Sequence, residues 1–257
     1  ILNLSPYMAR VSFTLWQSVY PLGQWAAKRF KRAYIAVSDF APGHESEEAF
    51  TKGFKEGGGE IIGTVRIPLA NPDFVPYMQR VKDSRPDALF AFNPAGRKAT
   101  AMMKAYGDLG LDKAGIKYIG PGDITTDEEL QGMGDVALGV ITAHHYSAAA
   151  DRPANKAFVA AYKKEYGEKL FPGFMSVGAW DAMDAIFHVI REQKGRIDPD
   201  RTMELLKRYT NPNSPRGPIA IDPDTRDIVQ NEYLREVRRV GGQLANVELE
   251  TIATALK

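Results

Sequence analysis

Short apolar runs and amphipathic segments alternate along the first 146 residues of this chain. A continuous apolar run is typical of a parallel strand that is buried on both faces, and an amphipathic segment is typical of a helix with one apolar side. The alternation predicts an α/β fold with a doubly wound parallel sheet. The expected strands lie at 34–37, 60–67, 87–92, 117–120 and 138–146, and the expected helices at 17–29, 44–55, 74–84, 97–109 and 127–131.

The pattern changes after residue 147. Two helices are expected in succession, at 154–166 and 174–193, with no strand between them, and a third helix is expected at 199–209. The last part of the chain alternates apolar and polar residues, which is typical of antiparallel strands with one wet face. These strands are expected at 216–221, 231–240 and 243–250. The helix-rich segment is therefore expected to belong to a different part of the fold from the parallel sheet.

Three of the expected parallel strands are followed by similar loops, at 38–43, 93–96 and 121–125, and each loop leads into a helix N-terminus. Parallel strands place such loops at one edge of the sheet, where open α/β folds bind ligands. Free N–H groups at helix N-termini suit a carboxylate or another small polar group. Phe40 offers an aromatic wall, and hydrogen bonds are expected from Ser38, Asn93, Asp123 and Thr125. The alternative, that the Pro and Gly residues of these loops only make turns, remains open.

Composition narrows the class of protein. The chain has 257 residues, of which 44% are hydrophobic and 25% charged, so it is long enough and apolar enough to bury a core. The net charge of +1 gives no electrostatic reason to expect nucleic acid or an anionic membrane as a partner. The absence of cysteine excludes disulfides, thiolate catalysis and Cys-ligated zinc.

The sequence offers little for catalysis. It has no phosphate-binding loop, no dinucleotide fingerprint and no nucleophile elbow. His144 and His145 are expected on one strand, so their side chains should point to opposite faces, one buried and one exposed, and should not share a metal. His44 is expected to be a capping or solvated histidine at a helix start. The segment 222–227 lacks the spacing and the glycine of a calcium-binding loop and is expected to be a turn.

The first residues resemble the interior of a protein. The chain begins with Ile1 and has no initiator Met, no basic region and no small-residue cleavage site near its start. A trimmed or incomplete gene product is the favoured explanation, and a mature protein cut at this point is the alternative.

Several segments, in order and spacing, resemble a known family. The sequence is similar to the solute-binding proteins of ABC importers of the branched-chain amino acid (Leu/Ile/Val) type, which have a type I periplasmic binding fold. The resemblance covers essentially the whole chain. The segments that carry it are Ser5-Pro6-Tyr7, 36–43, 48–58, Asn71-Pro72-Asp73-Phe74, 86–90, Asn155-Lys156-Ala157-Phe158 and Ser214-Pro215-Arg216-Gly217-Pro218.

The resemblance implies two α/β lobes joined by three crossovers that close on a ligand like a hinge. It implies that the N-terminal half of lobe one is absent, so that the helices of 152–197 lack the sheet that they would cover. The implied parts are a crossover at 1–11, the C-terminal lobe at 12–143, a crossover at 144–151, the helical part of the N-terminal lobe at 152–197, and a return crossover with closing strands of the C-terminal lobe at 198–257.

The resemblance also implies a ligand site, with departures from the amino-acid-binding members. Those members contact the ligand through a Tyr in the first loop, an aromatic residue in the second and an acid in the third. Here Pro42 stands in the place of the Tyr, with Phe40 two residues earlier, and Gly122 stands in the place of the acid, with Asp123 next to it. These departures, and the PGHE and SPRG segments, favour relatives that bind aromatic carboxylates such as benzoate derivatives.

Lobe one is implied to add an apolar contact from the first residues of the helix at 174–193. The candidate ligand-binding residues are Ser38, Asp39, Phe40, Pro42, Asn93, Pro94, Gly122, Asp123, Phe174 and Met175.

The expected function is the substrate-binding component of an ABC importer. It would bind an amino acid or an aromatic acid between two lobes and deliver it to a membrane permease from the periplasm. No catalytic step, cofactor, metal or nucleic-acid partner is expected. An effector-binding sensor or regulator domain of the same fold is the alternative, although no basic helix-turn-helix is present, and an enzyme fragment of flavodoxin type is a third option.

Overall fold

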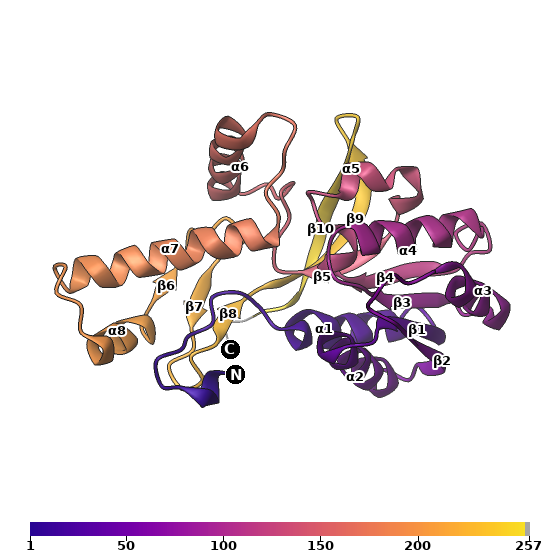
Figure 1. Cartoon of the computed structure of the whole chain (residues 1–257), viewed down its shortest axis with the longest axis horizontal. Helices are drawn as coiled ribbons and strands as arrows, with labels where there is room; N and C mark the ends of the chain where they lie inside the picture. The colour runs from indigo at the N-terminus through magenta and orange to yellow at the C-terminus, as the bar shows by residue number, and fades with distance from the viewer. Residues whose placement is uncertain (255–257) are drawn as a thin grey trace. The chain divides into compact units, whose positions relative to one another are not determined.

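The computed structural model describes residues 1–254. Within this range the chain forms two compact units, each built from separate stretches of sequence (Figure 1). Of the described residues, unit 1 contains Ile1–Phe13, His145–Glu232 and Thr254, and unit 2 contains Thr14–His144 and Tyr233–Ala253.

Unit 2 is built on one seven-stranded sheet with the strand order β10-β9-β5-β4-β3-β1-β2. The five strands from β5 to β2 are parallel, whereas β9 pairs with β5 in the antiparallel sense. The predicted doubly wound sheet is therefore confirmed, with an antiparallel edge added by the C-terminal strands. The strands are β1 (Arg32–Ser38), β2 (Glu60–Ile67), β3 (Ala88–Phe92), β4 (Lys117–Pro121), β5 (Ile141–His144), β9 (Glu232–Val240) and β10 (Gln243–Ala253).

Helices cover both faces of this sheet, as the buried β1 and β3 require. The core on one face includes Tyr34 and Ala36 with Met78 and Met102, whereas Phe50 stacks on Phe90 at 4.1 Å between ring centroids on the other face. Figure 1 shows α3 and α4 on one side of the sheet and α1 and α2 on the other. The helices are α1 (Leu15–Ala27), α2 (Ala41–Glu56), α3 (Val75–Ser84), α4 (Arg97–Asp108) and α5 (Leu130–Met133), with short 3-10 helices η2 (Gly122–Thr125) and η3 (Asp135–Ala137).

Unit 1 is mostly helical. It contains η1 (Leu2–Leu4), α6 (Pro153–Tyr166), α7 (Phe174–Glu192) and α8 (Pro199–Leu206). Its sheet has three short strands, β6 (Thr210–Asn211), β7 (Ile219–Ile221) and β8 (Ile228–Gln230), in that order. The strand expected at 216–221 is shorter than predicted, because Pro218 has no N–H to donate to a ladder and the side chain of Arg216 serves another purpose.

Arg216 organises the interior of unit 1. Its guanidinium lies in full burial and donates from Nε to Oδ2 of Asp181 at 2.7 Å. The same group donates to the main-chain oxygens of Val11 at 2.6 Å and Ser12 at 3.1 Å, and to Oε1 of Gln230 at 2.7 Å. One side chain thus holds α7 and the two segments of unit 1, at residues 11–12 and at residue 230, from which the chain passes into unit 2.

The assignment of the segments of this chain to two lobes and three crossovers stays a prediction. The structure groups α8 and β6–β8 with unit 1, whereas the interpretation above placed all of 198–257 in a return crossover and the C-terminal lobe.

Among the described residues, no helix is both long enough and apolar enough to cross a membrane.

Candidate functional site

The candidate loops lie at the carboxyl edge of the sheet in unit 2. The first is shorter than predicted, because α2 begins at Ala41 rather than at His44, and Pro42 lies in its first turn. Only Asp39 and Phe40 therefore connect β1 to α2. Proline is well suited to the first turn of a helix, since its missing N–H has no partner there in any case.

A short hydrogen bond ties the first two loops together. Ser38 donates from Oγ to Oδ1 of Asn93 at 2.5 Å, and both side chains are buried. Asn93 in turn directs Nδ2 toward Sδ of Met102 in α4 at 2.5 Å. Two of the predicted site residues are thus brought together, each with a fixed orientation.

Strand register places the end residues of four strands in one row. Val37 pairs with Phe92, so Ser38 and Asn93 follow side by side. The Phe90–Ile119 and Pro121–Ala143 pairs extend the row to Gly122 and His144. Because β1, β3, β4 and β5 are parallel, the carboxyl ends of all four strands lie at the same edge of the sheet. We call Ser38, Asn93, Gly122 and His144 the edge row.

Gly122 cannot carry a side chain in this arrangement. A Cβ atom there would overlap the His144 ring and would lie 2.6 Å from Nη2 of Arg235. The position at which the family resemblance places an acid is therefore filled from the neighbouring strand by an imidazole. Any residue other than glycine at 122 would require His144 to move.

Asp123 is a buried carboxyl group next to the edge row. Burial raises the pKa of Asp123 to about 6, and the nearby Arg235 and a backbone hydrogen bond only partly offset this effect. Its Oδ2 has no hydrogen-bond partner among the described residues. A buried acid in this state costs folding free energy, which is common where a group serves binding or catalysis.

Phe40, which is expected to offer an aromatic wall to the ligand, packs on another aromatic ring of unit 2. Its ring stacks on Phe92 with 6.0 Å between centroids and an angle of 18° between ring planes. Pro94, two residues after Phe92 in the sequence, is half-buried. Asp39 is exposed, and its Oδ1 lies 2.7 Å from Nε2 of His44. The His44 side chain is 41% exposed, so it is partly solvated, in agreement with the expectation of a capping or solvated histidine.

Two further predicted residues lie in unit 1. Phe174 is the first residue of α7 and packs edge-to-face on Phe13 at 5.4 Å between centroids. Met175, next to it, is 64% exposed. The role of these ten candidates in ligand binding stays a prediction.

Sequence reasoning missed two polar side chains that support the third loop. Arg235 of β9 is buried and donates from Nε to Thr142 Oγ1 at 3.1 Å. Asn246 of β10 accepts from Thr125 Oγ1 at 2.9 Å and donates to the main-chain oxygen of the same residue at 2.7 Å. The burial of Arg235 had one signal in the sequence: this arginine occupies an inward-facing position of a strand in which apolar and polar residues alternate.

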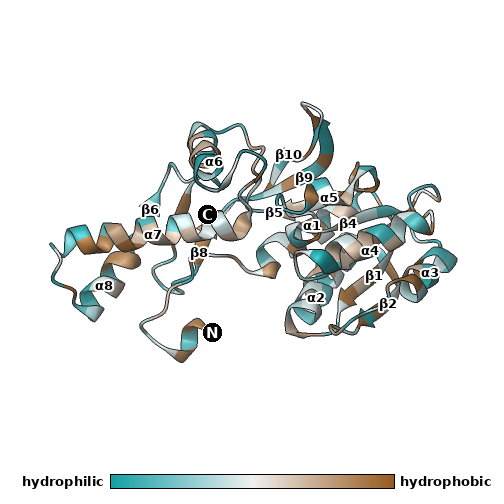
Figure 2. Ribbon diagram, turned by 45° about the horizontal axis from the view of Figure 1, so that its top comes forward, coloured by the Kyte–Doolittle hydropathy of each residue, from teal (hydrophilic) through white to brown (hydrophobic). Residues whose placement is uncertain are grey.

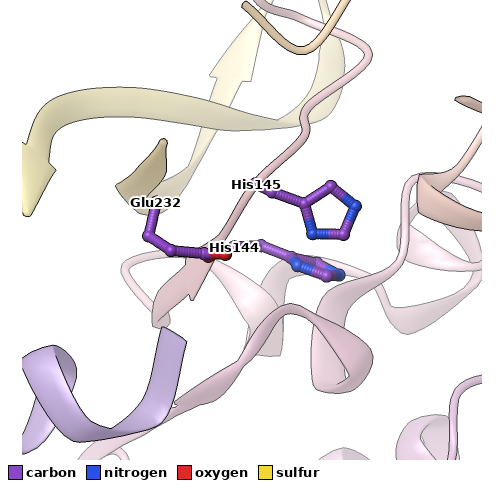
Figure 3. A group of neighbouring side chains, drawn as sticks. All are labelled: His144, His145 and Glu232. Carbon is purple, nitrogen blue, oxygen red and sulfur yellow. The ribbon is translucent and has the colours of Figure 1, made fainter. Parts of the chain in front are cut away.

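His144, His145 and Glu232 lie where the chain leaves unit 2 and where it returns (Figure 3). His144 pairs with Tyr233 across β5 and β9, so the next residues along both segments are neighbours, and the donor atoms of the three side chains come within 4.8 Å of one another. The expectation that the two histidines point to opposite faces, one buried and one exposed, is wrong. Both rings are buried and their ring nitrogens lie close together, because β5 ends at His144 and strand alternation does not extend to His145. The predicted absence of a metal stays a prediction.

The first turn of α2 gives a test of the edge row. A Cβ atom at Gly43 would overlap the main-chain oxygen of Ser38, so Gly43→Ala is expected to displace Ser38 and weaken its hydrogen bond to Asn93. We expect a loss of about 1–3 kcal/mol in the free energy of unfolding, the usual cost of overpacking, measured by urea denaturation.

Gly132→Ala is the matched control, because no atom lies within 4 Å of the Cβ position in α5. Alanine favours a helix over glycine by about 1 kcal/mol, so this variant should be as stable as the wild type or more stable. Equal stability of the two alanine variants would contradict the role assigned to Gly43.

The fold defines a class of protein: a two-unit α/β protein in which the edge row lies at the carboxyl edge of a parallel sheet. A family model described as periplasmic binding protein matches residues 3–243. The chain belongs to this family, and its fold is that of the type I periplasmic binding proteins. The family that the sequence resembles is thus confirmed.

Curated relatives are longer than this chain. The chain is 42% identical over 253 residues to the Leu/Ile/Val-binding protein homolog 6 of Brucella melitensis, covering 98% of this chain and 65% of the relative. A protein of the same name from Brucella abortus gives the same identity and coverage. The chain therefore spans just under two thirds of the length of the curated relatives that it matches.

Solved structures of similar proteins carry ligands. One is the solute-binding protein of an ABC transporter from Rhodopseudomonas palustris BisB5 in complex with 3,4-dihydroxybenzoic acid, at 49% identity and a TM-score of 0.94, covering 100% of this chain and 69% of that protein. Another is an R. palustris solute-binding protein in complex with 4-hydroxybenzoate, at 41% identity and a TM-score of 0.94, covering 99% and 69%.

Proposed function

We propose that this chain is the substrate-binding component of an ABC importer and that it binds a small carboxylate-containing solute. The observation that carries the proposal is the edge row with its buried Ser38–Asn93 hydrogen bond, at the edge where open α/β sheets bind ligands. Family membership and the ligand-bound neighbours support it. Closure of two lobes around the solute is part of the proposal, since family resemblance implies it.

An aromatic acid is the favoured solute, and an amino acid is the alternative. The Phe40–Phe92 stack offers a flat apolar surface, and the His144 ring excludes an acidic side chain at position 122. An α-ammonium group would need such an acid, whereas a benzoate derivative would not. The names of the Brucella relatives favour the amino acid, and the neighbours with hydroxybenzoates favour the aromatic acid.

The remaining roles follow from an import function. The protein performs no chemical step and needs no cofactor or metal, and it passes its solute to the membrane permease of the transporter. The periplasm is the compartment in which proteins of this family meet such a permease.

A ligand screen tests the proposal directly. Thermal unfolding of the chain would be followed with 4-hydroxybenzoate, 3,4-dihydroxybenzoate, benzoate and L-leucine. A true ligand at 100 times its Kd stabilises the protein by about 2.7 kcal/mol, whereas an inert compound leaves the midpoint unchanged. Stabilisation by leucine alone would select the amino acid, and no stabilisation by any of the four would contradict binding by this chain.

Substitution of Asn93 by aspartate tests the position of the solute. Asn93→Asp keeps the shape of the side chain but places a negative charge in the edge row, so an anionic solute should bind at least about tenfold more weakly, which corresponds to about 1.4 kcal/mol. Isothermal titration calorimetry with the best ligand of the screen would measure the change.

Asn71→Asp is the matched control, because Asn71 is an exposed residue of unit 2 outside the edge row. This variant should bind as the wild type does. If Asn93→Asp also bound with unchanged affinity, the solute would lie elsewhere.

A further inference from the structure

Three buried side chains of types that bind metals meet at the end of the ladder that joins β5 to β9. His144 is the last residue of β5, His145 follows it, and Glu232 is the first residue of β9. Each of the three is 1% exposed, and each offers a ligand atom that lies within 4.8 Å of the other two. We call His144, His145 and Glu232 the ladder cluster.

Strand pairing fixes the backbone of the ladder cluster. His144 pairs with Tyr233 in the antiparallel sense, so His145 and Glu232, the residues next to this pair, are neighbours. Figure 3 shows both imidazole rings on one side of the segment that carries them. The sequence predicts no shared metal because adjacent residues of a regular strand point to opposite faces. The end of β5 at His144 removes that reason.

Two aromatic rings of unit 1 pack against His145. Its ring centroid lies 5.1 Å from that of Phe13 and 6.3 Å from that of Phe174. Phe174 is the first residue of α7, a helix that is hydrophobic along most of its length (Figure 2). An apolar shell of this kind restricts the access of solvent to a metal site and lowers the dielectric constant around it.

The buried charges of the protein favour an added cation. Among the described residues, the buried carboxylate side chains outnumber the buried arginine side chains by four to two. Buried charges are costly unless they are paired or coordinate a metal, and Arg216 already forms an ion pair with Asp181. The buried charged side chains are Asp123, Asp127, Asp181, Glu232, Arg216 and Arg235.

The ligand types of the ladder cluster select a transition metal. Two imidazoles and one carboxylate are a donor set of zinc sites that keep an open fourth position, whereas Mg²⁺ and Ca²⁺ take oxygen ligands. Bonds of about 2.0–2.2 Å place the ligand atoms of a tetrahedral zinc site about 3.4 Å apart. The donor atoms of the cluster would therefore approach one another by at most about 1.4 Å, which small side-chain rotations can supply.

We propose that the ladder cluster binds one divalent transition-metal ion and that Zn²⁺ is the ion that its ligands fit best. His144, His145 and Glu232 are the three protein ligands, and water takes the fourth position. The ion joins the end of β5 to the start of β9, in addition to the hydrogen bonds of the ladder. The import function proposed above needs no such ion, so the two proposals fail independently.

Titration of the chelator-treated chain with Zn²⁺ and with Co²⁺, both without solute, tests the proposal. Isothermal titration calorimetry with Zn²⁺ should give one site per chain with a Kd of about 1 µM or lower. Co²⁺ should give the strong visible absorption of a four- or five-coordinate ion, because a six-coordinate ion at the surface absorbs only weakly. Added Zn²⁺ should abolish this absorption.

His145→Gln and Glu232→Gln each remove one ligand of the ion. Each variant should weaken Zn²⁺ binding at least about 100-fold, since the loss of a group that only supports a ligand already costs about 10–100-fold. His44→Gln is the matched control, because His44 also lies 2.7 Å from a carboxylate, that of Asp39, but both side chains are partly exposed. This variant should bind Zn²⁺ as the wild type does.

Two results would overturn the proposal. The first is Zn²⁺ binding that is unchanged in both His145→Gln and Glu232→Gln, because the ion would then lie elsewhere. The second is a wild-type protein that binds no Co²⁺ or shows only the weak absorption of a six-coordinate ion. The Co²⁺ spectrum needs the wild type alone, so it decides the question even where a ligand variant does not fold.

Discussion

Replacing Arg216 by methionine is expected to lower the free energy of unfolding by about 3–5 kcal/mol, the usual cost of removing one partner of a buried ion pair. The Asp181 carboxylate would remain buried without its cation, since both side chains of the pair are fully enclosed. The main-chain oxygens of Val11 and Ser12 would also lose a donor. Urea denaturation at pH 7 measures the change as a shift of midpoint at constant slope.

Arg10→Met is the matched control for this prediction. Arg10 also pairs with a carboxylate of unit 1, Asp227 at 3.0 Å, but both side chains are partly exposed. A pair of that kind contributes about 0.2–1 kcal/mol. The double variant Arg216→Met with Asp181→Leu should recover part of the loss, because an apolar pair of similar size can replace a buried ion pair. Similar losses for Arg216→Met and Arg10→Met would show that the buried network contributes little.

Replacing Asp123 by asparagine is expected to stabilise the protein at neutral pH. Burial raises the pKa of Asp123 from 3.8 to about 6 in the folded state, so the folded protein holds this proton more tightly than the unfolded chain. The bound proton therefore stabilises the folded wild type fully below about pH 4, and this stabilisation is lost as the pH rises through about 6. At pH 7 and above the lost stabilisation amounts to about 3 kcal/mol, at 1.36 kcal/mol for each pKa unit. The amide side chain of the variant would carry no charge and would avoid this loss.

Unfolding in urea at several pH values between 4 and 8 measures this difference. The difference in the free energy of unfolding between Asp123→Asn and the wild type should increase with pH and become constant above about pH 7. Asp108→Asn serves as control, since Asp108 is an exposed partner of Lys104 and a surface pair contributes little. A difference in the free energy of unfolding that does not change with pH would mean that burial does not desolvate the Asp123 carboxyl group.

Local pattern predicted the sheet and the order of its loops well. The apolar runs that became β1, β3 and β4 are continuous, because parallel strands are buried on both faces, and that signal needs no knowledge of the partner strand. The ends of elements were less accurate. Helix α2 begins at Ala41 although Pro42 and Gly43 suggested a loop, because a proline in the first turn and a glycine against Ser38 both fit a helix start.

Burial of polar groups could not be predicted from the sequence. Arg216 was noticed as part of a family segment, and Arg235 was not noticed at all, yet both side chains are among the largest that are fully buried. Their partners, such as Asp181 for Arg216 and Thr142 for Arg235, lie far away in sequence. The burial of His145 also depends on where β5 ends, which is set by its pairing with β9.

The antiparallel pairing of β5 with β9 has a consequence for the synthesis of the chain. Segment 14–144 contains five parallel strands with their helices and is continuous, so it can begin to fold as soon as it leaves the ribosome. Its last strand, β5, then keeps an open edge until all of 145–232 has been made and β9 arrives. Open edges invite pairing with other chains. The four-residue length of β5 limits the aggregation hazard of the nascent chain during that interval.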